Sequence, residues 1–210
     1  MIDYLHDKIA EYVKRIEGTR RTLEIGAFDV NGGVRDLFMN DIRHEEYIGT
    51  DMREGPGVDF VVDSHDLLKY FPPRSFDTIV WLETMEHDSA FWLTMGNINQ
   101  LIKPDGYLMM SAPTIGYEEH RHPQDYWRFT EDAFHLLLDG WKICQFDRFE
   151  NEWEGKKVTL SFSVLAQRPE VPLDQLAAAN ERIAKLENQI DYLMSKVKIS
   201  GTASGGVVRG

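Results

Sequence analysis

The stretch Glu24-Ile25-Gly26-Ala27-Phe28-Asp29-Val30-Asn31-Gly32-Gly33 decides the fold of this chain. A short apolar run, Thr22–Ile25, leads directly into this glycine-rich turn, and a helical pattern, Gly33–Met39, follows it. A glycine-rich loop between a strand and a helix lets a ligand approach the backbone closely, with the N–H groups of the helix pointing at it. The stretch therefore predicts a ligand-binding α/β unit.

Further apolar runs alternate with helical patterns, which is typical of βαβ units and a parallel sheet. The expected strands are Thr22–Ile25, Tyr47–Thr50, Val58–Val62, Phe76–Leu82, Gly106–Ser111, Trp141–Phe149 and Val158–Ala166. The expected helices are Ile2–Ile16, Gly33–Met39, Ala90–Leu101 and Thr130–Leu138. Only Glu150–Lys157 separates the last two strands, so we expect an antiparallel hairpin at the sheet edge. The sequence predicts an α/β domain over residues 1–168, with a seven-stranded, mostly parallel sheet and helices on both faces.

Composition narrows the possible functions. The 210 residues carry a net charge of −12, which argues against a broad nucleic-acid-binding surface. The single cysteine, Cys144, rules out an internal disulfide framework. The first residues resemble no signal peptide and no apolar run approaches the length of a membrane span, so a cytoplasmic protein without a membrane span is expected.

Acidic residues end the first strands of the predicted sheet. Asp51 follows Gly26 by 25 residues, and Asp63 ends the next strand. An acid at the place of Asp51 can accept hydrogen bonds from two ribose hydroxyls, and carboxyl ends of parallel strands are where open α/β sheets bind ligands. Each feature also has a structural interpretation, Gly26 as a plain turn and the two aspartates as helix caps. As an ordered set they indicate an adenosine-type pocket.

The charge of this pocket favours a cationic nucleoside. The dinucleotide fingerprint G-x-G-x-x-G is broken by Phe28 and Asn31, which disfavours an oxidoreductase that uses a nicotinamide cofactor. S-adenosylmethionine instead carries a sulfonium and an ammonium group. The acids expected near the mouth are Glu24, Asp29, Asp51, Asp63 and Glu83.

With these residues in order, the chain resembles the class I S-adenosylmethionine-dependent methyltransferases of the small methyltransferase-domain type, over about residues 20–168. The motifs that carry the resemblance are Leu23-Glu24-Ile25-Gly26-Ala27, Gly49-Thr50-Asp51, Val62-Asp63-Ser64-His65-Asp66-Leu67, Ser75-Phe76-Asp77-Thr78-Ile79-Val80 and Leu101-Ile102-Lys103-Pro104-Asp105-Gly106-Tyr107-Leu108. The resemblance implies a Rossmann-like sheet, S-adenosyl-L-methionine as cofactor, and methyl transfer. The chain departs from the family pattern at Phe28, where many members have glycine.

The resemblance also implies which residues hold the cofactor. The loop after the first strand would lie beside the methionine part, Asp51 would hold the ribose, and Asp63 would meet the adenine amino group. The residues expected at the cofactor are Glu24, Gly26, Ala27, Phe28, Asp51, Met52, Asp63, Ser64, Trp81, Leu82 and Glu83.

The connection Ala112–Thr130 is long and rich in histidine and aromatic residues, and loops at this end of a sheet often carry function. We expect a general base among His120, His122 and His87, oriented by Asp125. Acceptor contacts are expected from Tyr117, Arg121, Tyr126, Trp127 and Arg128. The structural interpretation makes Trp127 and Phe129 a buried lid and pairs Arg128 with a carboxylate.

A metal interpretation of the same loop would use His120, His122 and Asp125 as ligands. The adjacent Arg121 and Pro123 argue against it, so no bound metal is expected.

The carboxyl-terminal part of the chain contains a heptad repeat over residues 174–197, after a linker over 169–173. Apolar residues recur at the first and fourth heptad positions: Leu176, Ala179, Ile183, Leu186, Ile190, Leu193 and Val197. This narrow stripe favours a parallel two-stranded coiled coil, so a homo-oligomer, with a dimer preferred over a trimer, is expected. The alternative is an amphipathic helix that packs on its own domain. Residues 198–210 are expected to be a disordered tail.

Two functional hypotheses follow. The first is a methyltransferase that acts on a small or carbohydrate-type acceptor, with O-methylation of a sugar in glycan biosynthesis as the specific case. The second is a methyltransferase-fold scaffold without catalysis, which oligomerises through its coiled coil.

Overall fold

The computed structural model describes residues 3–30, 32–40, 44–121 and 124–170, together with Lys185 and Gln189. The chain divides into two compact units, Met1–Pro169 and Glu170–Gly210. The predicted coiled coil and tail lie outside the described residues, apart from Lys185 and Gln189, and stay predictions.

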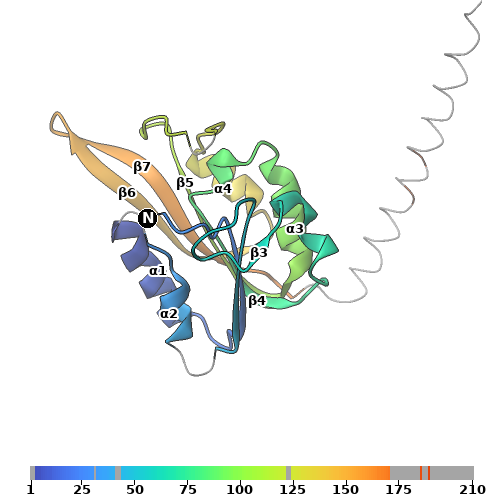
Figure 1. Ribbon diagram of the computed structural model, residues 1–210. Coiled ribbons are helices and arrows are strands. Elements are labelled where there is room, and N and C mark those ends of the chain that lie inside the picture. The colour runs from blue at the N-terminus through green and yellow to red at the C-terminus, as the bar shows by residue number, and fades with distance from the viewer. Residues whose placement is uncertain are drawn as a thin grey trace, which may run out of the picture. The chain divides into compact units, whose positions relative to one another are not determined.

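The first unit is built on one seven-stranded sheet with the order β3-β2-β1-β4-β5-β7-β6 (Figure 1). Its strands are β1 (Arg21–Ile25), β2 (Glu46–Asp51), β3 (Phe60–Val61), β4 (Phe76–Leu82), β5 (Ile102–Pro113), β6 (Lys142–Trp153) and β7 (Lys156–Gln167). Neighbouring strands from β3 to β5 pair in parallel, whereas β7 pairs antiparallel with both β5 and β6. The prediction of a mostly parallel sheet closed by a hairpin is confirmed.

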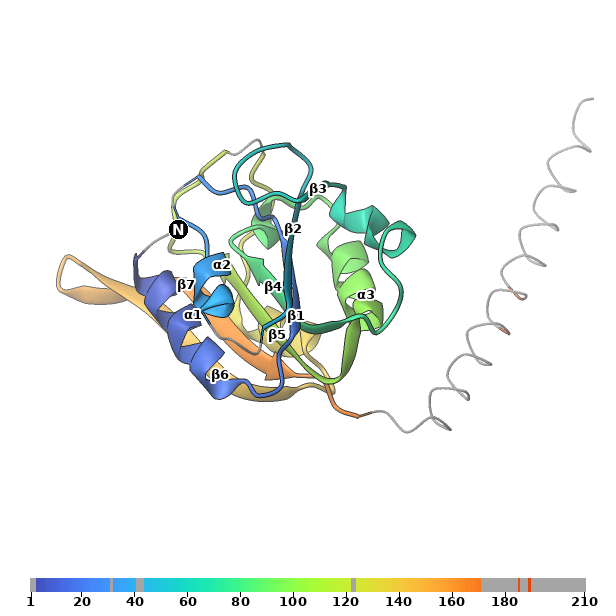
Figure 2. The ribbon, with the colours of Figure 1, turned by 60° about the horizontal axis from the view of Figure 1, so that its bottom comes forward.

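Helices cover both faces of the sheet because its central strands are apolar on both faces. In β4, Ile79 and Trp81 pack in the core with α3 and α4, whereas Val80 and Leu82 pack in the core with α1 and α2. Figure 2 shows α1 and α2 on one side of the sheet and α3 on the other. The helices are α1 (Asp3–Arg15), α2 (Arg35–Met39), α3 (Phe91–Leu101) and α4 (Glu131–Leu137), with 3-10 helices η1 (Ser64–Lys69) and η2 (Met85–His87).

The third strand is shorter than the sequence predicts. Val58–Val62 was the expected range, but β3 keeps only Phe60–Val61. The reason lies at Asp59, whose carboxylate accepts the backbone N–H of Gly49 at 2.7 Å and pairs with Arg35. This side chain takes the Gly49 N–H that a strand carbonyl would otherwise accept, although the Asp59 N–H still donates to the Gly49 carbonyl at 2.8 Å. The strand therefore begins at Phe60, two residues after Val58.

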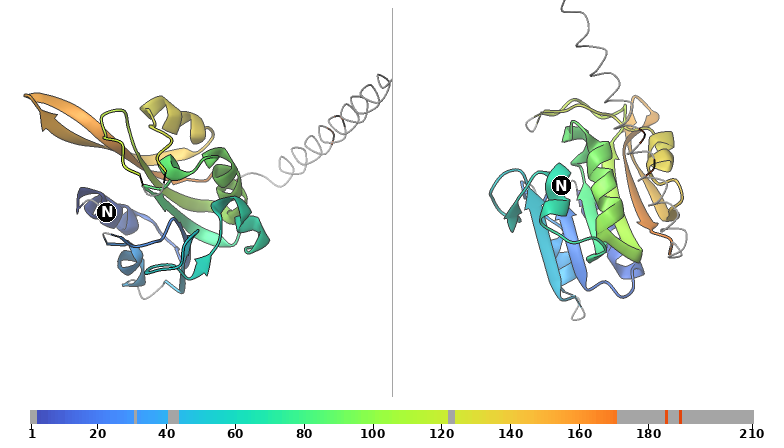
Figure 3. Two further views of the ribbon diagram at one scale, coloured as in Figure 1. Left: turned by 45° about the horizontal axis from the view of Figure 1, so that its top comes forward. Right: turned by 90° about the vertical axis from the view of Figure 1, so that its right-hand side faces the viewer.

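The hairpin β6–β7 extends past the rest of the sheet at one edge (Figure 3). It places β7 between β5 and β6, with Ser111 of β5 opposite Ser163 of β7. In the described residues, no helix is both long and apolar enough to cross a membrane.

Candidate active site

The turn after β1 is fixed by a glycine that no other residue can replace without strain. Gly26 has a φ of 79°, and a Cβ there would lie 2.1 Å from Oγ1 of Thr84. The N–H groups of Gly26 and Ala27 both donate to the carbonyl of Thr50, at 2.8 and 2.9 Å. The turn therefore packs closely between the carboxyl end of β2 and the residues that follow β4.

The parallel register aligns the carboxyl ends of four neighbouring strands. Ile25 of β1 lies opposite both Thr50 of β2 and Trp81 of β4, and Asp51 lies opposite Val61 of β3. The residues that follow these positions therefore gather at one edge of the sheet. The structure brings Gly26, Asp51, Asp63 and Glu83 to this edge, as the sequence predicted.

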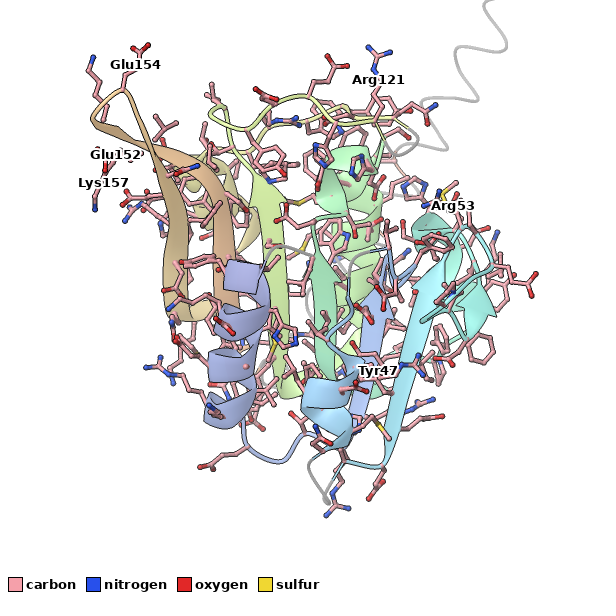
Figure 4. All side chains as sticks on the ribbon, turned by 60° about the vertical axis from the view of Figure 1, so that its left-hand side comes forward. Tyr47, Arg53, Arg121, Glu152, Glu154 and Lys157 are labelled. Carbon is pink, nitrogen blue, oxygen red and sulfur yellow. The ribbon has the colours of Figure 1, made fainter. Side chains whose placement is uncertain are left out.

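Asp51 faces a cation of its own chain. Its Oδ1 accepts the N–H of Arg53 at 2.9 Å and lies 3.8 Å from Nε of the same residue. The Arg53 guanidinium in turn lies 4.6 Å from the centre of the Phe28 ring, which packs against Gly55. The family departure at Phe28 thus has a structural consequence, because the aromatic ring supports an arginine beside the candidate ribose-binding acid. Figure 4 shows Arg53 at this end of the molecule.

Asp63 has the capping role that the sequence left open, and its side chain stays accessible. It caps η1, because its carboxylate accepts the N–H of His65 at 2.9 Å. The side chain is still 46% exposed, so it can meet a ligand as well. Ser64, next to it, is tied to α3 by Thr94, whose hydroxyl donates to it at 2.8 Å, and by Asn97.

The other residues expected at the cofactor fall into buried and exposed groups. Trp81 and Leu82 are core side chains, so only their backbone can border a ligand, and Met52 is largely exposed. Glu24 is buried and accepts the hydroxyl of Tyr47 at 2.8 Å. Burial raises the pKa of Glu24 to about 7, so this acid carries only part of a negative charge at neutral pH.

A second cluster lies where β4 ends, in η2 and the loop after β5. Glu83, with a φ of 44°, accepts the hydroxyl of Ser161 at 3.0 Å. Burial, followed by the charge of Glu86, raises the pKa of Glu83 above its ordinary value. Three residues further on, the Glu86 carboxylate is fully buried, with His87 and His120 at 3.6 and 3.5 Å.

The loop after β5 is held in place by an ion pair. Both oxygens of Asp125 bind the guanidinium of Arg128, at 2.5 and 2.7 Å, which holds the pKa of Asp125 well below its usual range. Arg128 also donates to the carbonyls of Tyr117 and Glu118. Arg128 is therefore a structural residue of the loop, the alternative that the sequence had left open.

Asp125 also contacts a predicted base. Its Oδ2 accepts the N–H of His120 at 2.7 Å and lies 3.3 Å from Nδ1 of the same histidine. The nearby Glu86 carboxylate raises the pKa of His120. The Tyr117 ring lies 5.3 Å from the His120 ring, and the His87 ring lies 4.8 Å from it. The structure thus brings together Asp125, His120, His87 and Tyr117, whereas His122 lies outside the described residues.

The remaining predicted acceptor residues lie further out. Arg121 pairs with Glu119 and points away from the molecule in Figure 4. Tyr126 is half exposed, and the indole N–H of Trp127 donates to the carbonyl of Asp88 at 2.8 Å. Trp127 is 36% exposed, whereas Phe129 is buried, so the structural interpretation is confirmed for Phe129 and is wrong for Trp127.

Sequence reasoning missed two contributions to the site. Glu86 was not among the expected site residues, although an acid beside a histidine at a strand end is itself a signal. A hollow beside Glu83 is lined by Tyr4 and Leu5 of α1 and by Phe149, Ser161, Phe162 and Ser163 of the hairpin. Nothing in the local sequence of α1 indicates that it reaches the site.

No protein-family model and no curated protein matches the chain. Solved structures do. A SAM-dependent methyltransferase from Archaeoglobus fulgidus is similar with a TM-score of 0.61 and 16% identity, over 79% of this chain and 94% of that one. A Burkholderia thailandensis 1,6-didemethyltoxoflavin-N1-methyltransferase, solved with S-adenosylhomocysteine, has a TM-score of 0.57 and 16% identity, over 79% and 78% of the two chains.

The same fold also occurs in an enzyme of another class. The [4+2]-cyclase SpnF is similar with a TM-score of 0.59 and 14% identity, over 80% of this chain and 81% of that one. At these identities the likeness concerns the fold alone. The chain has the fold of the class I S-adenosylmethionine-dependent methyltransferases.

Proposed function

We propose that this chain is an S-adenosylmethionine-dependent methyltransferase that acts on a small or carbohydrate-type acceptor. The observation that carries the proposal is the strand-end edge, where the Gly26 turn meets Asp51 of β2 and the half-exposed Asp63 after β3. A nucleoside ligand at this edge meets the carboxylates of Asp51 and Asp63, which suit ribose hydroxyls and an amino group. The structural neighbour that was solved with S-adenosylhomocysteine supports the choice of ligand.

The second cluster suits the acceptor side. In methyl transfer an acceptor oxygen forms a bond to the methyl carbon, the carbon–sulfur bond breaks, and its electron pair stays on sulfur, which becomes a thioether. A hydroxyl acceptor also gives up its proton, and a positioned histidine can take it. His120 lies between Asp125 and Glu86 and is 29% exposed, so it is placed to do this. This supports oxygen methylation of a sugar as the specific reaction.

A non-catalytic scaffold remains the second candidate function, and one observation favours it. Arg53 lies against Asp51 and is stacked on Phe28, so a ribose must compete with a cation of the chain. A protein that keeps the fold without the reaction could tolerate such a contact.

Calorimetric titration with S-adenosylhomocysteine tests the proposal. We expect one site per chain, and Asp51→Asn should weaken binding by about 1–3 kcal/mol because a charged hydrogen-bond partner is lost. Asp66→Asn is the matched control, because Asp66 is an exposed acid of η1 that pairs with Lys69. Absence of binding at millimolar ligand would refute the cofactor assignment.

Transfer of a labelled methyl group to a panel of free sugars, nucleotide-linked sugars and small amines then separates the two functions. Product from a sugar acceptor supports the enzyme. Cofactor binding without transfer to any acceptor favours the scaffold.

A further inference from the structure

We propose that Glu86, His87 and His120 form a binding site for one divalent transition-metal ion at the carboxyl end of β4. One ligand atom from each residue lies within 4.8 Å of the other two. Two residues come from η2 and the third from the loop after β5, so the fold, and not a local motif, assembles the set. The sequence predicted no bound metal, and the metal alternative at this loop joined His120 to His122 and Asp125.

The distances between the ligand atoms suit a metal ion, provided that the ligands move slightly closer together when it binds. Nε2 of His87 and Nε2 of His120 lie 3.6 and 3.5 Å from the same oxygen of Glu86. Ligand atoms at 2.0–2.1 Å from a tetrahedral Zn²⁺ are about 3.4 Å apart. Both pairs that include Glu86 are already near this separation, and only the two imidazoles need to approach each other.

The Glu86 carboxylate supplies the independent reason for a cation. It is fully buried, and neither of its oxygens accepts a hydrogen bond from the described part of the chain. A buried carboxylate without such partners is costly, so it requires a compensating positive charge.

His87 is oriented as metal ligands usually are, whereas Nδ1 of His120 lies near the Asp125 carboxylate without a hydrogen bond to it. Nδ1 of His87 bonds to the carbonyl oxygen of Gln124, and Nδ1 of His120 lies 3.3 Å from the Asp125 carboxylate. Metal-binding histidines typically place their other ring nitrogen against a carbonyl or carboxylate, which fixes the ring and its tautomer. Nε2 of His87 is therefore the nitrogen left to face Glu86, and Nε2 of His120 lies 3.5 Å from the same carboxylate.

The loop alternative of His120, His122 and Asp125 is weaker on the same grounds. Asp125 already accepts three hydrogen bonds, two from Arg128 and one from the backbone N–H of His120. A carboxylate in a bidentate ion pair would have to give up its arginine to bind a metal.

The ion would have an open side. Glu86 is buried, whereas the side chains of His87 and His120 are 16% and 29% exposed. Two imidazoles and one carboxylate leave at least one coordination position, and the ligand types suit Zn²⁺, Mn²⁺ or Co²⁺. Resting on the proposed methyl transfer, we infer that an acceptor hydroxyl takes this position, where the cation favours loss of its proton to water. His120, whose Nε2 binds the ion, then acts as a ligand and not as the base.

The test is titration of the full-length chain, after removal of metals by a chelator, with Co²⁺ and with Zn²⁺. We expect one ion per chain by calorimetry and visible Co²⁺ absorption bands typical of nitrogen ligation. Glu86→Gln, His87→Ala and His120→Ala should each weaken binding more than 10-fold. His135→Ala is the matched control, because His135 is a half-exposed histidine of α4 whose carboxylate neighbour, Glu131, lies 3.9 Å away.

Two further measurements make each outcome decisive. Each variant is also titrated with S-adenosylhomocysteine, and its thermal unfolding is recorded. Loss of metal binding is taken as evidence for the site only in variants that fold and still bind the nucleoside. Lack of stoichiometric binding by the wild type, or equal affinity in His87→Ala, overturns the metal site and leaves the proposed function standing. Loss confined to His122→Ala and Asp125→Asn overturns it in favour of the loop set.

Discussion

At the scale of single residues, a side chain at Gly26 would cost stability in two ways, through the left-handed backbone conformation and through a clash with Thr84. A matched pair of variants can separate these two effects. Gly26 and Gly18 both have a φ near 75°, at 79° and 70°. A Cβ at Gly18 meets nothing within 4 Å, whereas one at Gly26 meets Oγ1 of Thr84 at 2.1 Å. Gly18→Ala should therefore cost only the left-handed conformation, about 1–2 kcal/mol.

Gly26→Ala should cost about 2 kcal/mol more than Gly18→Ala, because the turn or Thr84 must also move. Urea unfolding of the two variants measures the difference. Equal losses of stability would contradict the close packing of the turn on Thr84. Since this turn borders the proposed nucleoside site, Gly26→Ala should also weaken binding of S-adenosylhomocysteine, and Gly18→Ala should not.

The buried acid Glu24 makes the stability of the fold depend on pH. Its folded-state pKa is about 7, above the 4.5 of the unfolded chain, because burial favours the neutral acid. This stabilising contribution is therefore fully present below pH 4.5 and is lost as the pH rises to 7. The loss amounts to about 3 kcal/mol at most.

Glu24→Gln removes this dependence and keeps an acceptor for the Tyr47 hydroxyl. The stability of the variant relative to the wild type should increase by about 3 kcal/mol between pH 4 and pH 8. Urea unfolding across this pH range measures the free energy of unfolding of both proteins. Glu83 makes a similar pH-dependent contribution in both, so it cancels in the difference between variant and wild type. Glu46→Gln, an exposed acid of β2, is the control and should show no such trend. If the stability difference between Glu24→Gln and the wild type did not change with pH, Glu24 would have to be exposed to solvent.

At the scale of the elements, the strands were predictable because each combines an apolar run with a turn signal. Phe76–Leu82 was predicted with the bounds of β4, since both of its faces are buried and its run is uninterrupted. β3 was overestimated, because no local pattern shows that the Asp59 carboxylate binds Gly49.

The second cluster was less predictable for a related reason. Glu86 and His120 are 34 residues apart, and they meet because the Glu86 carbonyl accepts the N–H of Tyr126 at 2.8 Å. The course of that loop also depends on the pair of Asp125 and Arg128. Sequence spacing could place His120 and Asp125 in one loop, but it could not place the loop against η2.

The helix α1 is fastened to the hairpin through one buried hydroxyl. The Tyr12 hydroxyl donates to Asp147 at 2.8 Å and lies 3.1 Å from the Ser163 hydroxyl. Tyr12→Phe should destabilise the fold by about 1–3 kcal/mol, because two polar groups lose a partner. Thermal unfolding measures the loss, and Tyr70→Phe, at an exposed tyrosine, is the control. Unchanged stability in Tyr12→Phe would show that water replaces the hydroxyl.

At the scale of the whole molecule, the heptad over residues 174–197 predicts assembly of two chains. The apolar seam includes Leu186, and its neighbours Lys185 and Glu187 lie outside it. Leu186→Lys places a charge in the seam and removes a buried leucine from each chain, at a cost of about 2–5 kcal/mol per chain. Lys185→Glu changes a charge of the same helix and leaves the seam intact.

Sedimentation equilibrium of the full chain separates a paired helix from one that packs on its own domain. We expect a dimer for the wild type and for Lys185→Glu, and a dissociation constant raised more than 100-fold for Leu186→Lys, because each 1.4 kcal/mol changes the constant tenfold. A monomeric wild type would refute the coiled coil, and a dimer that persists in Leu186→Lys would place the interface elsewhere. The nucleoside site provides an internal check, since the turn at Gly26 and the acid Asp51 belong to the first unit. The affinity for S-adenosylhomocysteine should therefore be the same for the dimeric and the monomeric forms. This result would show that assembly and nucleoside binding depend on different parts of the chain.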